Sequence, residues 1–314
     1  RTYLDLSTEE EELLKYAGEN FDNVIVLVNS TNLMTLGAVE STPGVDACLL
    51  VGGTGDVGAK AIPEVLYGEV SPSGRTTDTY AYDFKTNSVD ANSGAEGIGY
   101  YTNADGLYPA DGETTNGNFH DNPLYDGVAY LDYAESIYVG YKWYETADAE
   151  GYWDNVSNEY GTGYDGVVQY PFGYGLSYTT FDWEVTDKTT DDLEKDGQVT
   201  ATVKVTNTGD VAGQDVVQLY YSAPYYKGEI EKSAVVLGDF AKTGILQPGE
   251  SEEVTLNIKV SDMASYDCYD KNNNGARTYE LDKGEYQIKL MNDSHHINSC
   301  DNSKTTFNLE NNMI

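Results

Sequence analysis

The chain has 314 residues, which is enough for two domains of ordinary size, and 39% of its residues are hydrophobic, which is enough for packed cores. Its 53 acidic and 18 basic residues give a formal net charge of −35, so we expect neither nucleic acid nor a membrane surface as a partner, whereas a neutral polar substrate is compatible with this charge. No segment approaches the roughly 20 apolar residues that a membrane helix needs.

The three cysteines form neither a disulfide framework nor a CxxC metal-binding spacing. Cys48 lies in an apolar run and is expected to be a small buried hydrophobe. Cys268 and Cys300 both fall in the second half of the chain, and the sequence leaves their pairing, and with it the redox compartment, open.

The first 80 residues read as alternating helices and strands. Ser7 with Glu10 three residues later forms a capping box, which predicts a helix start, and Gly18 is expected to end that helix. Residues 23–29 and 45–51 are apolar runs typical of strands buried on both faces, with a short helix predicted over 31–40. The strand, helix, strand order predicts a right-handed crossover and a parallel sheet.

A glycine-rich loop, residues 52–58, follows the second strand and precedes a helix predicted over 59–66. A phosphate-binding loop is one interpretation, but the loop has neither the GxGxxG nor the GK[ST] pattern, and Asp56 would repel phosphate. The other interpretation is a tight turn. Because ligands of open α/β sheets bind beyond the carboxyl ends of the strands, Asp56 is a candidate substrate-proximal residue.

Glu135 is the carboxylate with the most unusual sequence surroundings. It lies between Tyr133 and Tyr138, ahead of a predicted strand, and an acid among aromatic side chains can have a raised pKa. Glu135 is therefore a candidate catalytic acid. The alternative is a structural carboxylate that accepts hydrogen bonds from backbone, Arg or Lys donors.

Residues 169–181 mark a change of architecture, because only strands are predicted after them. Pro171 and the glycines at 173 and 175 predict a turn, and the aromatic side chains are expected to be largely buried. Short alternating runs then indicate a β sandwich, at residues 182–185, 199–207, 216–221, 235–240, 254–258 and 286–290.

Two features of the second half suggest metal ligands. Asp270, Asn272 and Asn274 place oxygen atoms at alternate positions before Gly275, as at the start of a calcium loop, although an Asn-rich hairpin turn is the other interpretation. His295 and His296 are adjacent and could bind a metal, but in a strand their side chains would point to opposite faces of the sheet.

Three long motifs, in this order, resemble glycoside hydrolase family 3. Residues 66–75, LYGEVSPSGR, are similar to its "vLfGevnPsGkLp" segment, residues 133–144 to its "YxExIxVGYRYY", and residues 170–181 to its "FPFGYGLSYTTF". The resemblance implies α/β followed by all-β: a partial α/β-sandwich domain over 1–181, with a variable loop insertion at about 81–130, and a fibronectin type III-like β sandwich over 182–314.

The resemblance also implies the chemistry. Such enzymes are retaining β-glycosidases, often β-glucosidases or β-xylosidases, with a nucleophile and an acid/base carboxyl about 5 Å apart. The family's nucleophile lies on a (β/α)₈ barrel, and its acid/base would fall just before Arg1, so we expect neither on this chain and no turnover by this chain alone. The implied partners are that barrel, from the same polypeptide or another chain, and a carbohydrate; no cofactor is implied, and a homo-oligomer is possible.

The segment from about 94 to 122 is longer than its family counterpart. It either lines a substrate entrance, with Tyr100, Tyr101 and Tyr108 as sugar-stacking surfaces, or packs as a surface loop. The resemblance favours a structural role for Glu135, since the family's catalytic acids lie elsewhere. The alternative function is a carbohydrate-binding or scaffold module without catalysis, which the 28 tyrosines also suit.

Overall fold

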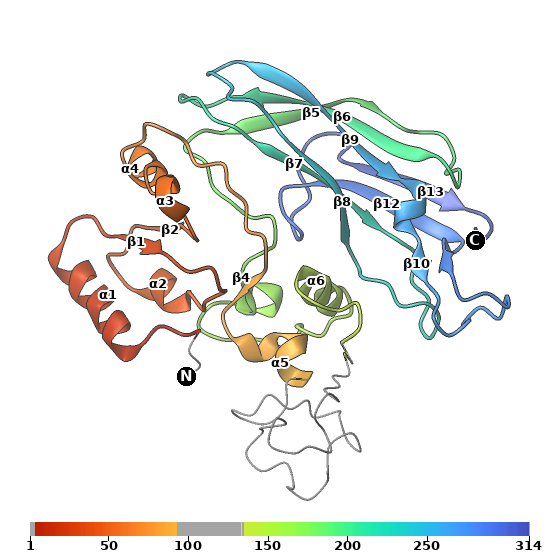
Figure 1. Cartoon of the computed structure of the whole chain (residues 1–314), viewed down its shortest axis with the longest axis horizontal. Helices are drawn as coiled ribbons and strands as arrows, with labels where there is room; N and C mark the ends of the chain where they lie inside the picture. Colours follow the sequence, from red (N-terminus) through yellow and green to blue (C-terminus); the bar gives the residue numbers. More distant parts are fainter. Residues whose placement is uncertain (1–3, 93–132, 134, 314) are drawn as a thin grey trace, which may run out of the picture.

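The computed structural model describes residues 4–92, 133 and 135–313, and it confirms a mixed α/β region followed by a β sandwich (Figure 1). The helices of the first region are α1 Thr8–Asn20, α2 Gly37–Ser41, α3 Gly55–Gly58, α4 Ala61–Leu66, α5 Ser88–Asn92 and α6 Tyr141–Ala149. Its strands are β1 Ile25–Val28, β2 Ala47–Leu50, β3 Tyr80–Ala81 and β4 Val168–Tyr170. Within the described part of the chain, no helix is both long enough and apolar enough to cross a membrane.

Helix α1 begins as the sequence predicts and ends later than predicted. The Ser7 side chain accepts a hydrogen bond from the Glu10 amide (3.2 Å), and the Ser7 amide donates to the Glu10 carboxylate (2.7 Å), so the capping box is confirmed. Gly18 does not stop the helix, which continues to Asn20. A Cβ at Gly18 would lie 2.2 Å from the carbonyl oxygen of Pro43, so the glycine is required by the close approach of another segment.

We expect Gly18→Ala to destabilise the fold by on the order of 1–3 kcal/mol, because the clash with a backbone carbonyl outweighs the roughly 1 kcal/mol that alanine gains in a helix. Gly58→Ala is the matched control, since a Cβ there meets its nearest neighbour, Thr54, at an ordinary 3.4 Å. Urea denaturation of both variants measures the difference. A Gly18→Ala protein as stable as Gly58→Ala would contradict the close-approach explanation.

Strands β1 and β2 pair in parallel as predicted, with Ile25 opposite Ala47 and Val28 opposite Leu50. The expectation that both faces are buried is wrong for the described residues, because Ile25, Leu27 and Leu50 remain exposed. Among those residues the sheet has only these two strands. The predicted helix over 31–40 is confirmed only in its last part, as α2. Of the helix predicted over 59–66, residues 59 and 60 form a turn that follows α3, and the rest is α4.

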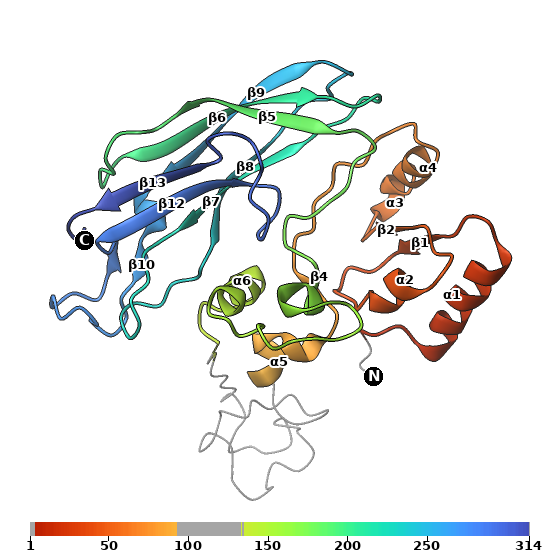
Figure 2. The same ribbon diagram turned by 180° about the vertical axis from the view of Figure 1, so that it is seen from behind.

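The segment after Glu135 is a helix, α6, and not the predicted strand. Apolar side chains at a spacing of three residues, Tyr144 and Ala147, both face a small core that includes Trp153. A spacing of three places side chains on one face of a helix, whereas a strand would send these two to opposite faces. Figure 2 shows α6 on the side of the α/β region that faces the sandwich.

The sandwich consists of two antiparallel sheets with the strand orders β13-β12-β7-β8 and β5-β6-β9. Its strands are β5 Phe181–Lys188, β6 Gln198–Asn207, β7 Val216–Ser222, β8 Val236–Lys242, β9 Ser251–Lys259, β12 Gly284–Met291 and β13 Lys304–Leu309, with a small hairpin of β10 Ser265–Tyr266 and β11 Tyr279–Glu280. All six predicted strands are present. The run at 286–290 is not the last strand, since β13 pairs with it and brings Phe307 opposite Tyr286 in the core.

Candidate functional site

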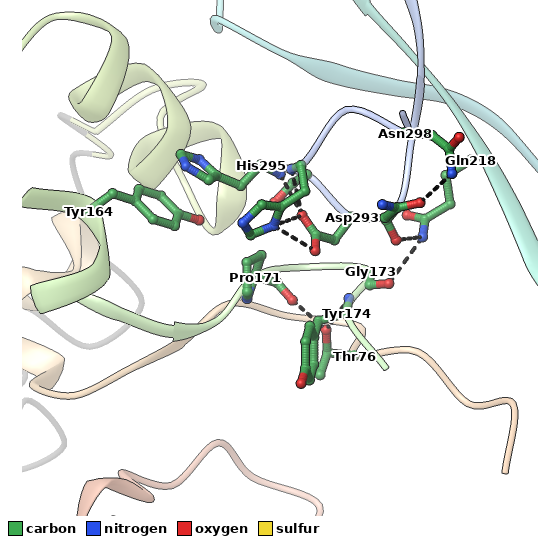
Figure 3. A network of polar contacts seen from close by, with 12 residues as sticks. Thr76, Tyr164, Pro171, Gly173, Tyr174, Gln218, Asp293, His295 and Asn298 are labelled. Carbon is green, nitrogen blue, oxygen red and sulfur yellow. Dashed lines mark hydrogen bonds and ion pairs between the residues drawn. The ribbon is translucent and has the colours of Figure 1, made fainter. Parts of the chain in front are cut away.

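The segment from Gln169 to Phe181 joins the two regions through backbone hydrogen bonds. Gly173 donates from its amide to the carbonyl of Thr76 (2.8 Å), and its own carbonyl accepts from the Gln218 side chain (3.0 Å) (Figure 3). Gly173 has φ +84°, and a Cβ there would lie 2.2 Å from the Gln218 side-chain oxygen, so only glycine fits this turn. Thr76 also donates from its hydroxyl to the carbonyl of Pro171 (2.5 Å).

The aromatic side chains of this segment are less buried than predicted. Phe172 is half-buried and stacks on Tyr141 (centroids 4.6 Å apart), and Tyr174 stacks on Tyr170 (5.2 Å). Tyr178 is exposed, and its hydroxyl donates to the carbonyl of Val65 (2.9 Å). The expectation of largely buried aromatics is therefore wrong, and backbone and side-chain hydrogen bonds also hold the segment in place.

A buried carboxylate on α6, Glu145, connects the α/β region to the loop that follows β12. It accepts hydrogen bonds from the Tyr164 hydroxyl (2.5 Å) and the Ser294 hydroxyl (2.9 Å), and it pairs with His295 Nδ1 (2.8 Å). The His295 ring stacks on Tyr164 with centroids 3.7 Å apart. These side chains form one contact network between the two regions.

The two histidines lie in a loop and not in a strand, so the expectation of opposite strand faces does not apply to them. Their rings meet edge to face at 5.1 Å, and His296 pairs with Asp293 at 3.0 Å. Burial lowers the pKa of His295, but its hydrogen bond to Glu145 and the negative charges of Glu145, Asp148 and Asp293 outweigh burial and raise the pKa overall.

We expect the stability of the chain to decrease as pH rises through this raised pKa of His295. A histidine whose pKa is higher in the folded state binds its proton more tightly there, so its contribution is complete below the ordinary value of 6.5 and is lost above the folded value. Urea denaturation between pH 5.5 and roughly pH 8.5 measures the slope. His295→Gln should reduce the change in the free energy of unfolding with pH. His296→Gln, at a histidine whose ring is exposed, is the control and should change this slope less. Equal slopes for wild type and His295→Gln would contradict this assignment.

A hollow of about 390 Å³ lies at the carboxyl end of β1. Its lining combines hydroxyl, amide, carboxylate and aromatic groups from four segments: Leu4, Thr31, Asn32, Leu33, Thr77, Asp78, Tyr80 and Phe84. Burial raises the pKa of Asp78, although a hydrogen bond from the Thr79 amide (2.9 Å) opposes that shift. The carboxyl end of a parallel strand is where open α/β sheets bind ligands.

The structure does not bring the sequence-predicted candidates into this hollow. Asp56 is exposed on α3 and is absent from the lining, although the glycine loop does approach it: a Cβ at Gly53 would lie 3.2 Å from Thr31. Glu135 is buried just before α6 and is also absent from the lining. The other three candidates lie outside the described residues: Tyr100, Tyr101 and Tyr108.

The calcium candidates lie in the turn between β10 and β11. The Asn272 and Asn274 side-chain amides donate to the buried Glu280 carboxylate, and the Gly275 amide donates to Asp270 (3.1 Å). These contacts make an Asn-rich hairpin, and calcium binding by Asp270, Asn272 and Asn274 stays a prediction. Across residues 4–92 and 135–313, no three His, Cys, Asp or Glu side chains are grouped as metal ligands. The three cysteines, Cys48, Cys268 and Cys300, are free.

Sequence reasoning missed Asp78, Glu145 and His295. Asp78 follows a Pro-Ser-Gly turn that was interpreted only as a turn, and about fifty residues separate it from the β1 loop that it faces. Glu145 directly follows the family motif at 133–144, and its neighbours in the sequence give no reason to expect burial. The repeated His-His pair was the one available signal for His295.

Comparisons with known proteins agree with this architecture. Residues 1–178 match the model of the glycosyl hydrolase family 3 C-terminal domain, and residues 215–294 match that of the fibronectin type III-like domain. The chain is 35% identical over 296 residues to β-glucosidase A of Butyrivibrio fibrisolvens, covering 91% of this chain and 30% of that protein. It is 32% identical to a β-glucosidase of Ruminococcus albus, covering 94% of this chain and 25% of that protein.

Solved structures show the same relation. A β-glucosidase from Paenibacillus barengoltzii superimposes with a TM-score of 0.76 at 30% identity, covering 98% of this chain and 28% of that one. β-glucosidase 3B from Thermotoga neapolitana, solved with α-D-glucose, superimposes with a TM-score of 0.70 at 30% identity, covering 99% of this chain and 35% of that one. The chain thus spans about a quarter to a third of the length of these relatives.

Proposed function

Because this chain belongs to glycoside hydrolase family 3, we propose that it is the downstream portion of a retaining β-glucosidase whose two catalytic carboxylates are supplied from outside these 314 residues. The complete enzyme would release terminal β-linked sugars from glycosides through a covalent glycosyl intermediate. Residues 1–181 would contribute part of an α/β-sandwich domain, and residues 182–314 would form the fibronectin type III-like domain.

The observation that carries this proposal is the open two-stranded sheet. A parallel sheet is ordinarily covered on both faces, and two strands alone are marginal in water. Here Ile25, Leu27 and Leu50 leave apolar side chains exposed, and α1 with its C-terminal cap exposes three more large apolar side chains: Leu13, Tyr16 and Phe21. Burying such side chains is favourable by about 1.5–3 kcal/mol each, so this face suits further protein structure.

The (β/α)₈ barrel and the remaining strands of the α/β domain are the partner that we propose for this face. The relatives contain two thirds or more of their length beyond the matched part, which is ample for both. Because this chain has a high negative charge, it would not be attracted to an acidic surface. We therefore expect apolar contact to be the main basis of the docking.

The experiment is an assay of this chain on aryl β-glucosides and β-xylosides. We expect no turnover above background, because the proposal places both carboxylates of the retaining pair outside these 314 residues. Addition of a polypeptide that holds the barrel and the remaining part of the α/β domain should restore activity, and Leu27→Asp on the open face should weaken that restoration. Turnover by this chain alone would refute the proposal, and sugar binding without restored activity would favour a non-catalytic module.

A further inference from the structure

We propose that the hollow at the carboxyl end of β1 binds a neutral sugar of about hexose size, with Asp78 as its main hydrogen-bond acceptor and Phe84 and Tyr80 as apolar surfaces. The choice of a sugar as the ligand rests on the proposed function. The site itself rests on the lining residues and their geometry.

The lining residues exclude anionic ligands and favour a neutral polar one. Among the residues that the structure describes, the lining contains one carboxylate, Asp78, and no lysine or arginine, so a phosphate or a carboxylate ligand would be repelled by Asp78 without a described cation to offset that repulsion. Thr31, Asn32 and Thr77 add hydroxyl and amide groups that both donate and accept hydrogen bonds. A ligand with many hydroxyl groups and no charge uses all of these partners.

Asp78 has the free hydrogen-bonding capacity that such a ligand needs. Its Oδ1 accepts one hydrogen bond, from the adjacent Thr79 amide at 2.9 Å, and within the described part of the chain no second donor to this carboxylate is found. A carboxylate accepts up to about four hydrogen bonds, so most of its capacity remains available. Because Asp78 is half-buried, a bond that it accepts from a ligand is less exposed to competition from water.

The aromatic residues give the hollow an apolar side and a fixed shape. Tyr80 begins β3, lies opposite Tyr170 on β4, and meets that ring edge to face with centroids 6.2 Å apart. Phe84 starts the short 3₁₀ turn that follows β3 and is half-buried. A volume of about 390 Å³ falls in the usual range of small-molecule sites, roughly 300–1,000 Å³, and such sites combine apolar surfaces with a few directed polar groups.

The test is a titration of this chain with glucose and with methyl β-D-glucopyranoside, followed by NMR chemical shifts or calorimetry. We expect saturable binding with Kd of about 1–50 mM. Asp78→Asn should weaken binding about 10-fold or more, because a charge-assisted acceptor becomes a neutral one. Asp56→Asn makes the same chemical change on an exposed carboxylate outside the lining and should leave Kd unchanged.

A second variant and a second ligand keep the test decisive. Thr77→Ala removes an exposed hydroxyl from the lining with little risk to folding, and it should weaken glucose binding a few-fold. Glucuronate carries a negative charge, so it should bind to the wild-type chain at least about 10-fold more weakly than glucose. No saturable binding, or equal Kd values for wild type and Asp78→Asn, would overturn the proposal. Those outcomes leave the proposed function intact, whereas glycoside turnover by this chain alone would refute that function and leave the sugar site standing.

Discussion

Asp215→Ala is expected to destabilise the chain by about 3–5 kcal/mol, because it leaves the partly buried Arg75 guanidinium and the buried Trp183 indole without their acceptor. The Asp215 carboxylate is buried just before β7, where it accepts from Arg75 Nη2 at 2.8 Å and from the indole nitrogen of Trp183 at 2.7 Å. Arg75 belongs to the α/β region and Trp183 to β5. The substitution therefore removes a contact between the regions and one within the sandwich.

Urea denaturation followed by tryptophan fluorescence measures this effect. Asp215→Asn should cost less, since the amide oxygen still accepts from one donor. The surface pair of Lys204 with Glu184, 3.5 Å apart and largely exposed, is the matched control, and Glu184→Ala should change the free energy of unfolding by less than about 1 kcal/mol. If Asp215→Ala and Glu184→Ala lowered the free energy of unfolding by similar amounts, the Asp215 contacts would contribute no more to stability than a surface ion pair.

Asp282→Ala is expected to have an effect of the same size, about 3–5 kcal/mol, because it leaves the ammonium group of Lys232 buried without a counter-charge. Both side chains are at least nine-tenths buried, and Lys232 Nζ donates directly to the Asp282 carboxylate. The pair ties the segment before β8 to the segment before β12. The same segment accepts hydrogen bonds from Tyr138 of the α/β region, at Glu231 and at the Lys232 carbonyl.

The double variant Lys232→Met with Asp282→Leu is the control for this prediction. Replacing both charges by apolar groups of similar volume leaves no isolated buried charge, so it should cost clearly less than Asp282→Ala and is expected to be near neutral. Thermal and urea denaturation of the single and double variants form a cycle that isolates the pair. A double variant as unstable as the single one would place the effect in packing and not in charge.

Two side-chain pairs connect the α/β region to the sandwich. Arg75 with Asp215 and Glu145 with His295 both cross between the regions, and the chain separates their partners by 140 and 150 residues. In the complete enzyme that we propose, these contacts would help to orient the face of β1 and β2 relative to the sandwich. The pH dependence predicted for His295 is a property of the same joint.

The sequence by itself determined the local elements and the family. The capping box at Ser7, the parallel pair β1 and β2, and the alternating strands of the sandwich depend on side-chain spacing within a few residues, so they are visible without a structure. The three family motifs are likewise contiguous. Even the wrong prediction for α6 has a local cause, since a short apolar run fits a strand or a helix until its packing is known.

Only the tertiary structure decided which distant residues meet. Gly18 was interpreted as a helix stop because its conflict with Pro43 lies in another segment, and the hollow of Asp78 is assembled from several segments of the chain. Burial, ion pairing and pKa depend on neighbours in space, and one sequence without its fold does not state those neighbours. The sequence therefore identified the family, while the structure located the hollow at the carboxyl end of β1, the buried ion pairs and the exposed sheet.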